Sequence, residues 1–235
     1  MNKLYKLILF FTASVFLSCG IESYVYLPQV SESNIIRMVN TDAQIYLPST
    51  TNTYFRNYAI YYKIYTGINL LSNTPQTDYA LFSTALSNDY NAIRPYTDPA
   101  NASYSTGIDN LFKSRNYYQL SFVGKDNNAM MPMGGTLIIV FPTSAGSSPY
   151  AYLENNPNDI VFLNRSDSIY DPAPDRFFLN SNDLRTNDRN TDVARTGGTY
   201  VAASMYIVAV GYDDIEFKQV FSKPTHIHFF AFAGN

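Results

Sequence analysis

The chain has 235 residues, 46% of them apolar, and a formal net charge of −3 from 16 basic and 19 acidic side chains. Nucleic acid is usually bound through clustered Lys and Arg, so this balance argues against a nucleic-acid partner. The single cysteine excludes an intrachain disulfide, and 21 Tyr with 16 Phe and no Trp favour an all-β protein with polar loops, stabilised by its core alone.

The first 18 residues have the organisation of an export signal. Lys3 and Lys6 precede an apolar run over residues 7–17, and Ser18 is the small residue expected before a cleavage point. The run is shorter than the roughly 20 residues that a membrane-spanning helix needs. Residues 1–18 are therefore expected to be removed. This leaves 14 of the 16 basic side chains against all 19 acidic ones, a formal charge of −5.

Cys19 lies directly after this signal, and the sequence Phe16-Leu17-Ser18-Cys19 resembles a bacterial lipobox. Most lipoboxes have leucine where this chain has Phe16, a departure that resembles the relaxed lipobox of spirochaetes. The resemblance implies a diacylglycerol thioether on Cys19 and an N-acyl chain, such as palmitate, on the new amino terminus. The alternative is ordinary cleavage that leaves a reactive free thiol. Two or more acyl chains anchor a protein stably to a membrane. Apart from these covalent lipids, we expect no cofactor.

The anchor predicts where the exported domain lies. Residues 19–23 are a short tether, and residues 24–235 are expected to form one elaborated domain without a low-complexity linker. The four residues after Cys19 span at most about 14 Å when extended. The domain is therefore expected in the cell envelope, close to an inner or outer membrane, and facing the periplasm.

Alternating and continuous apolar segments predict mostly strands. In residues 58–65, Tyr58, Ile60, Tyr62 and Ile64 share one face, which is expected to point into the core. Residues 136–141 are apolar throughout, as expected of a strand covered on both sides. The most continuous apolar segment of the exported chain predicts a central strand over residues 200–210. Further strands are expected at 24–27, 35–39, 43–47, 117–123 and 160–163, and within 217–232, with a turn at 213–214.

Helices are expected in only two places. Thr74-Pro75 has the pattern of an N-cap followed by proline in the first helical turn, and apolar residues recur at helical spacing up to Asn88. A further turn is expected at residues 107–113. Residues 164–198 are rich in Asn and Asp and predict a long solvated loop.

Two segments resemble strands of an immunoglobulin-like or fibronectin type III sandwich. Residues 58–65 resemble the C strand, and residues 205–214 followed by 222–225 resemble the F strand and the F–G turn. The chain is also similar to small spirochaetal (treponemal) lipoproteins of unassigned role. This second resemblance is carried by the signal, by residues 88–93 and by residues 222–227, taken together with the two strand segments. These resemblances imply an envelope compartment and a β-sandwich core with a short helical insertion and long polar loops. They imply no reaction.

Two groups of residues have side chains that bind metals. His226 and His228 stand two apart on an expected strand and so are predicted to project to one side, where Asp213, Asp214 or Glu216 would have to complete a site. The acid and amide residues between 183 and 192 lack the spacing of an EF-hand loop. Exposed or interfacial histidines and a solvated loop are the favoured interpretations, so no metal is expected.

Tyrosines are the candidate ligand-binding residues, because they offer a large area and a hydroxyl group at little entropic cost. Five of them lie in predicted loops: Tyr96, Tyr104, Tyr150, Tyr152 and Tyr170. They favour a surface that contacts a protein or a glycan. Compositional bias, which raises Tyr, Phe, Asn and Ile together, is the competing explanation.

The sequence favours a lipid-anchored, non-enzymatic binding or structural module, with no catalytic residue assigned. The chain has no G-x-S-x-G segment and no phosphate-binding glycine pattern. A carbohydrate-active envelope enzyme is the first alternative, since it needs only two suitably separated carboxylates. A metal-binding module centred on His226 and His228 is the second. The ligand and the oligomeric state are left open.

Overall fold

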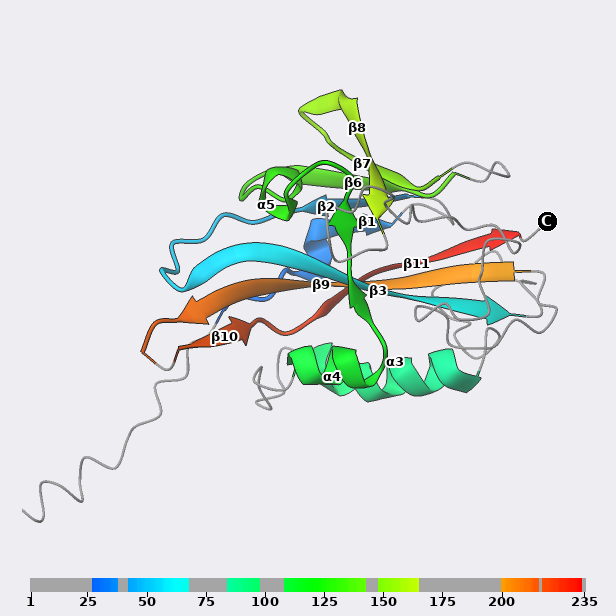
Figure 1. Ribbon diagram of the computed structural model, residues 1–235, viewed down its shortest axis with the longest axis horizontal. Coiled ribbons are helices and arrows are strands. Elements are labelled where there is room, and N and C mark those ends of the chain that lie inside the picture. Colours follow the sequence, from blue (N-terminus) through cyan, green and yellow to red (C-terminus); the bar gives the residue numbers. More distant parts are fainter. Residues whose placement is uncertain are drawn as a thin grey trace, which may run out of the picture.

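The computed structural model describes residues 27–37, 42–67, 84–97, 108–142, 148–164, 200–215 and 217–233. Most of these residues form two antiparallel β-sheets packed face to face, with two helices on the far side of one sheet (Figure 1). The expectation of an all-β sandwich is therefore confirmed. The signal, Cys19, the tether and nearly all of residues 164–198 lie outside the described residues.

Sheet A has six strands in the order β1-β2-β6-β7-β8-β5. Their bounds are β1 Ile35–Arg37, β2 Asp42–Tyr46, β6 Thr136–Val140, β7 Tyr150–Leu153, β8 Asn156–Asn164 and β5 Ser121–Phe122. The prediction for residues 136–141 was partly wrong. Leu137 and Ile139 are buried against sheet B, but the alternate side chains of β6 are only half-buried, because no layer formed by the described residues covers that face completely.

Sheet B is built around the long strand β9. It consists of β3 Phe55–Gly67, β4 Tyr118–Gln119, β9 Tyr200–Asp213, β10 Lys218–Phe221 and β11 Thr225–Ala233. β3 pairs with one side of β9, while β10 and β11 follow one another along its other side. The predicted central strand at 200–210, the turn after it and the returning strands are confirmed. Pro224 lies in the break between β10 and β11.

The core between the sheets contains the face of β3 that the sequence predicts. Tyr58, Ile60, Tyr62 and Ile64 are at most 2% exposed and belong to one apolar cluster with residues of β2, β6 and β9. The opposite face of β3 is also buried, which the alternation did not predict. There Tyr61 stacks on Phe112 of a helix, with ring centroids 4.5 Å apart.

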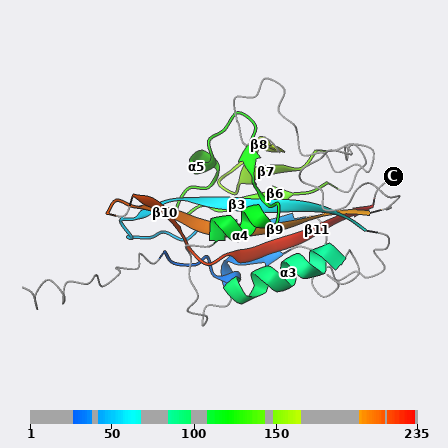
Figure 2. The ribbon, with the colours of Figure 1, turned by 60° about the horizontal axis from the view of Figure 1, so that its bottom comes forward.

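The helices that cover this second face are α3 Thr84–Thr97 and α4 Ile108–Ser114 (Figure 2). The turn expected at 107–113 is confirmed as α4. The first predicted helix ends too early, since α3 continues past Asn88 to Thr97; its predicted start at Thr74-Pro75 lies outside the described residues. Asp89, Ile93 and Tyr96 have helical spacing and face sheet B, so packing extends the helix. Shorter helical segments are η1 Glu32–Asn34 and α5 Asn127–Met130.

The two sheets are joined at their edges by segments that contact both. The predicted strand at 117–123 is two short strands, because the chain pairs with β3 through β4 and then with β8 through β5. A strand that changes sheets in this way forms a corner of a sandwich. At the other edge, residues 27–37 run beside β11, where the Gln29 side chain donates to the Pro224 carbonyl at 3.0 Å. Leu27 is buried outside any strand, and β1 ends at Arg37.

Candidate binding face and buried polar cluster

Sheet A presents two rows of half-exposed side chains on the face turned away from the core. Strand register places Gln44, Ile138 and Tyr152 in one row across β2, β6 and β7, and Asp42, Val140 and Tyr150 in the next. Residues opposite each other on neighbouring strands point to the same side of a sheet. We call these six residues the outer face of sheet A.

The two tyrosines of the outer face lie close together and have polar neighbours. Their ring centroids are 6.3 Å apart, with 26° between the planes. Partial burial, followed by the nearby Tyr152 hydroxyl and Asp42 carboxyl groups, raises the pKa of Tyr150 above its usual value. Its hydroxyl therefore stays protonated at neutral pH. Gln44 Nε2 donates to Glu154 Oε1 at 3.3 Å at the border of this face.

This arrangement brings together aromatic rings, short aliphatic side chains, an amide and a carboxyl group. Such a surface can stack on the apolar face of a sugar or peptide and hydrogen-bond to its edge. Sequence reasoning selected Tyr150 and Tyr152 but placed them in a loop, which was wrong. They lie on β7, where the alternation Tyr-Ala-Tyr buries Ala151 between them.

The other candidate tyrosines do not join this face. Tyr96 was also predicted in a loop, but it lies on α3 and packs against the apolar cluster between the helices and sheet B. Tyr104 and Tyr170 lie outside the described residues, as do the acid and amide residues between 183 and 192. Of the five predicted tyrosines, the structure brings together Tyr150 and Tyr152.

The two histidines do not project to one side, which corrects the sequence expectation. A bulge at Ile227 shifts the register of β11, so that His226 lies opposite Tyr206 and His228 lies opposite Met205. Tyr206 packs toward the helices, whereas Met205 packs into the core between the sheets. Because consecutive residues of β9 point to opposite faces, the two imidazoles are separated by the sheet.

His226 is buried and held neutral. Its ring lies 4.9 Å from that of Tyr206, and its Nε2 is 3.4 Å from Ser204 Oγ. Burial lowers the pKa of His226 to about 3, with smaller contributions from the positive charge of Arg37 and from His228. Arg37 also donates to the carbonyl oxygens of His226 and Ile227, at 2.6 and 2.8 Å, and so satisfies the backbone at the bulge.

Two of the acids considered as further metal ligands, Asp213 and Asp214, are remote from His226, and Glu216 lies outside the described residues. Asp213 lies seven residues along β9 from Tyr206, the partner of His226, a separation of about 23 Å in an extended strand. In the described ranges, no three His, Cys, Asp or Glu side chains gather closely enough to hold a metal ion.

A buried ion pair lies on the same helix-facing side as His226. Lys63 of β3 and Asp89 of α3 are 2.7 Å apart, with side chains 4% and 6% exposed, and Arg115 adds a longer contact of 3.5 Å to Asp89. Ser204 lies opposite Lys63 in the register and next to His226. We call Lys63, Asp89, Ser204 and His226 the buried polar cluster. The alternation placed Lys63 on the non-core face of β3 but did not reveal that α3 covers it.

No protein-family model, no curated protein and no solved structure matches the chain. None of the helices in the described part of the chain has the length and apolarity needed to cross a bilayer.

Proposed function

We propose that the protein is a lipid-anchored module of the cell envelope that acts by binding a protein or a glycan. The observation that carries the binding role is the pair of aromatic and polar rows on the outer face of sheet A, with Tyr150 and Tyr152 side by side. Cys19 and the preceding signal supply the anchor in this proposal. The described domain starts at Leu27, eight residues after Cys19, which keeps it close to the lipid.

Three of the described carboxylates have basic partners. Asp89 pairs with Lys63 inside the fold, while Asp159 pairs with Lys125 and Asp214 with Arg56 at the surface. A glycosidase needs two carboxyl groups that face one substrate, with one of them protonated at neutral pH. These three carboxylates instead have basic partners in separate parts of the fold. The carbohydrate-active alternative therefore gains no support from them.

An immunoglobulin-like relationship, which we also propose, is supported by sheet B. Its order β10-β9-β3 is the one expected for strands G, F and C, and β3 pairs with β9 as C pairs with F. Sheet A departs from that pattern, because β6, β7 and β8 follow outward from β2 in chain order. The proposed likeness is therefore confined to one layer of the sandwich.

The anchor is tested by replacing Cys19 with alanine. The wild-type chain is expected to partition into detergent and to show an intact mass that includes diacylglycerol and an acyl chain, because buried acyl methylenes hold it on the membrane. The Cys19→Ala variant should be released into detergent-free buffer, while Ser23→Ala in the same tether should not. A wild-type chain with an unmodified amino terminus would overturn the anchor.

The binding face is tested by crosslinking in the native envelope and by affinity measurement with the partner recovered. Replacing Tyr150 and Tyr152 with serine should weaken binding about tenfold or more, since tyrosines at interface centres often contribute about 2 kcal/mol each. Tyr96→Ser, on α3, serves as the matched tyrosine control. Unchanged affinity in the Tyr150 and Tyr152 variant, with its fold intact, would exclude this face as the contact surface.

A further inference from the structure

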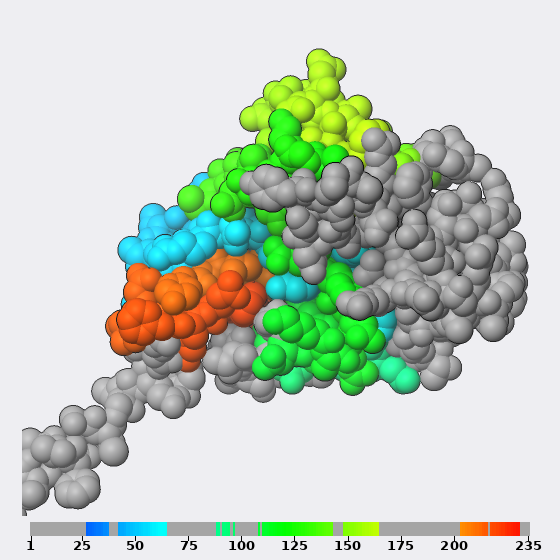
Figure 3. All heavy atoms as spheres, viewed as in Figure 1, coloured from blue at the N-terminus to red at the C-terminus, as the bar shows by residue number. Residues whose placement is uncertain are grey.

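The tip of the β9–β10 hairpin carries two strongly exposed apolar side chains. Ile215 is 71% exposed and Phe217 is 78% exposed, more than the other large apolar side chains in the described residues. Space-filling atoms show this hairpin, in orange, at one end of the molecule (Figure 3). Large apolar groups left in water at one projecting point indicate a contact surface.

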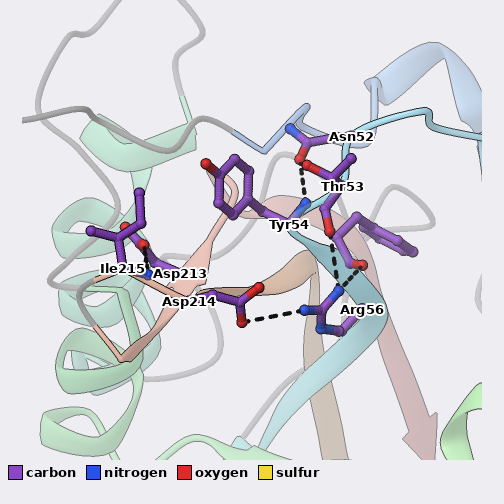
Figure 4. Close-up of polar contacts among 8 residues, drawn as sticks. Asn52, Thr53, Tyr54, Arg56, Asp213, Asp214 and Ile215 are labelled. Carbon is purple, nitrogen blue, oxygen red and sulfur yellow. Dashed lines mark hydrogen bonds and ion pairs between the residues drawn. The ribbon is translucent and has the colours of Figure 1, made fainter.

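The hairpin holds these side chains outward by local contacts (Figure 4). Asp213 Oδ1 accepts a hydrogen bond from the Ile215 N–H at 2.9 Å, and Asp214 lies 3.6 Å from the Arg56 guanidinium. Phe217 has a φ of 52°, a left-handed conformation that bulky residues rarely adopt. Such strain is often associated with function, because the surrounding structure must maintain it.

The amino-terminal end of the described chain lies at the base of this hairpin. Leu27 packs so closely against Gly211 of β9 that a Cβ atom there would be 2.9 Å from Leu27 Cδ1 and 2.4 Å from the Tyr54 carbonyl oxygen. Gly211 is only two residues before Asp213, where β9 ends. Leu27 is eight positions after Cys19, a reach of at most about 28 Å. Leu27, the described residue nearest in sequence to Cys19, therefore lies at the same end of the domain as the hairpin tip.

The side chains behind the tip suit a membrane interface. Tyr54, Phe55 and Tyr212 are half-buried there, and Arg56 and Lys218 are exposed beside them. Aromatic rings favour the boundary between lipid headgroups and acyl chains, and a basic side chain such as Lys218 can reach a phosphate group from it, while Arg56 is paired with Asp214 at the tip. Chain reach and side-chain chemistry thus favour a lipid surface over a second protein as the partner of this tip.

We propose that Ile215 and Phe217 insert into the headgroup and acyl boundary of the membrane that carries the lipid anchor. This inference rests on the anchor proposed at Cys19 and adds a second point of attachment. Two attachment points would orient the domain, whereas a single attachment point would leave it free to rotate. The outer face of sheet A would then keep a fixed relation to the membrane.

The absence of tryptophan from the sequence permits a direct test with single-tryptophan reporters. The full lipidated chain is prepared as Ile215→Trp and reconstituted into phosphatidylcholine vesicles, with and without bromine on the acyl chains. The fluorescence of this variant should shift to the blue on reconstitution and should be strongly quenched by the brominated lipid. Ile160→Trp is the matched control, because Ile160 is also exposed, at 50%, but lies on β8 of the other sheet.

Vesicle flotation in the same samples separates the two proposals. If the chain floats with the vesicles but Ile215→Trp is quenched no more than Ile160→Trp, the anchor stands and the inserted hairpin is wrong. If the chain does not float, the proposed anchor is wrong, and so is the insertion of the hairpin tip that rests on it. Preferential quenching of Ile215→Trp supports insertion. A blue shift that occurs without vesicles and rises with protein concentration would instead assign the tip to contact with a second copy.

Discussion

Replacing Asp89 with alanine is expected to lower the free energy of unfolding by about 3–5 kcal/mol, because it leaves the ammonium group of Lys63 buried without its close carboxylate. The two side chains are 2.7 Å apart and almost fully buried between α3 and sheet B. Arg115 lies 3.5 Å from Asp89 but is 40% exposed, so its side chain can return to water. The loss of stability should therefore arise mainly at Lys63. Urea unfolding of the two proteins measures it.

The chain offers a matched pair as the control. Lys125 and Asp159 are 2.8 Å apart, but their side chains are 40% and 46% exposed, so Asp159→Ala should cost no more than about 1 kcal/mol. Replacing Lys63 and Asp89 together with Met and Leu should restore most of the stability, because an apolar pair leaves no buried charge. Equal effects at Asp89 and Asp159 would show that burial does not decide the contribution of this ion pair.

Acidification from pH 7.5 to 5 is expected to destabilise the protein by about 2 kcal/mol through His226 alone. Burial lowers the pKa of His226 from 6.5 to about 3 in the folded protein. Above pH 6.5 the ring is neutral in both states. Below it, the unfolded chain binds a proton and the folded chain does not, so stability falls as the pH falls. The effect would reach about 4 kcal/mol at pH 3 and level off at roughly 5 kcal/mol at lower pH, where both states are protonated.

Comparison with His226→Gln isolates this contribution, because the variant lacks the titrating ring. Its stability should change less between pH 7.5 and 5, by about 2 kcal/mol, even if its stability at pH 7.5 differs from that of the wild type. His228→Gln should keep most of the wild-type dependence, since His228 is only the third cause of the His226 shift. Parallel pH curves for the wild type and His226→Gln would contradict the prediction.

Local patterns predicted the strands well where one face meets the core. The alternation of β3 and the apolar run of β9 were identified because both follow from which side chains avoid water. The same rule failed at residues 150–153, where a four-residue strand between short loops gives too little pattern. It also failed at the end of α3, because helical spacing stops at Asn88 in the sequence, whereas α3 extends to Thr97 through its packing on sheet B.

The candidate sites show the same division. Residue type selected His226, Tyr150 and Tyr152, but one extra residue in β11 separates the histidines onto opposite faces of sheet B. The sequence around Lys63 predicts a charge exposed to solvent. In the folded chain, Asp89, 26 residues away, lies against it and forms a buried ion pair. Such contacts between distant segments leave no periodic signal in either segment.

The β-rich class, the core face of β3 and the central position of β9 follow from the amino-acid sequence, because they depend on hydrophobic periodicity along one segment. The sequence is also the whole basis for the export signal and for the anchor proposed at Cys19, both of which lie outside the described residues. The outer face of sheet A, the buried polar cluster and the position of the hairpin tip beside Leu27 emerge only in the folded chain. Each depends on strand register or on packing between segments far apart in the chain, which local chemistry does not encode.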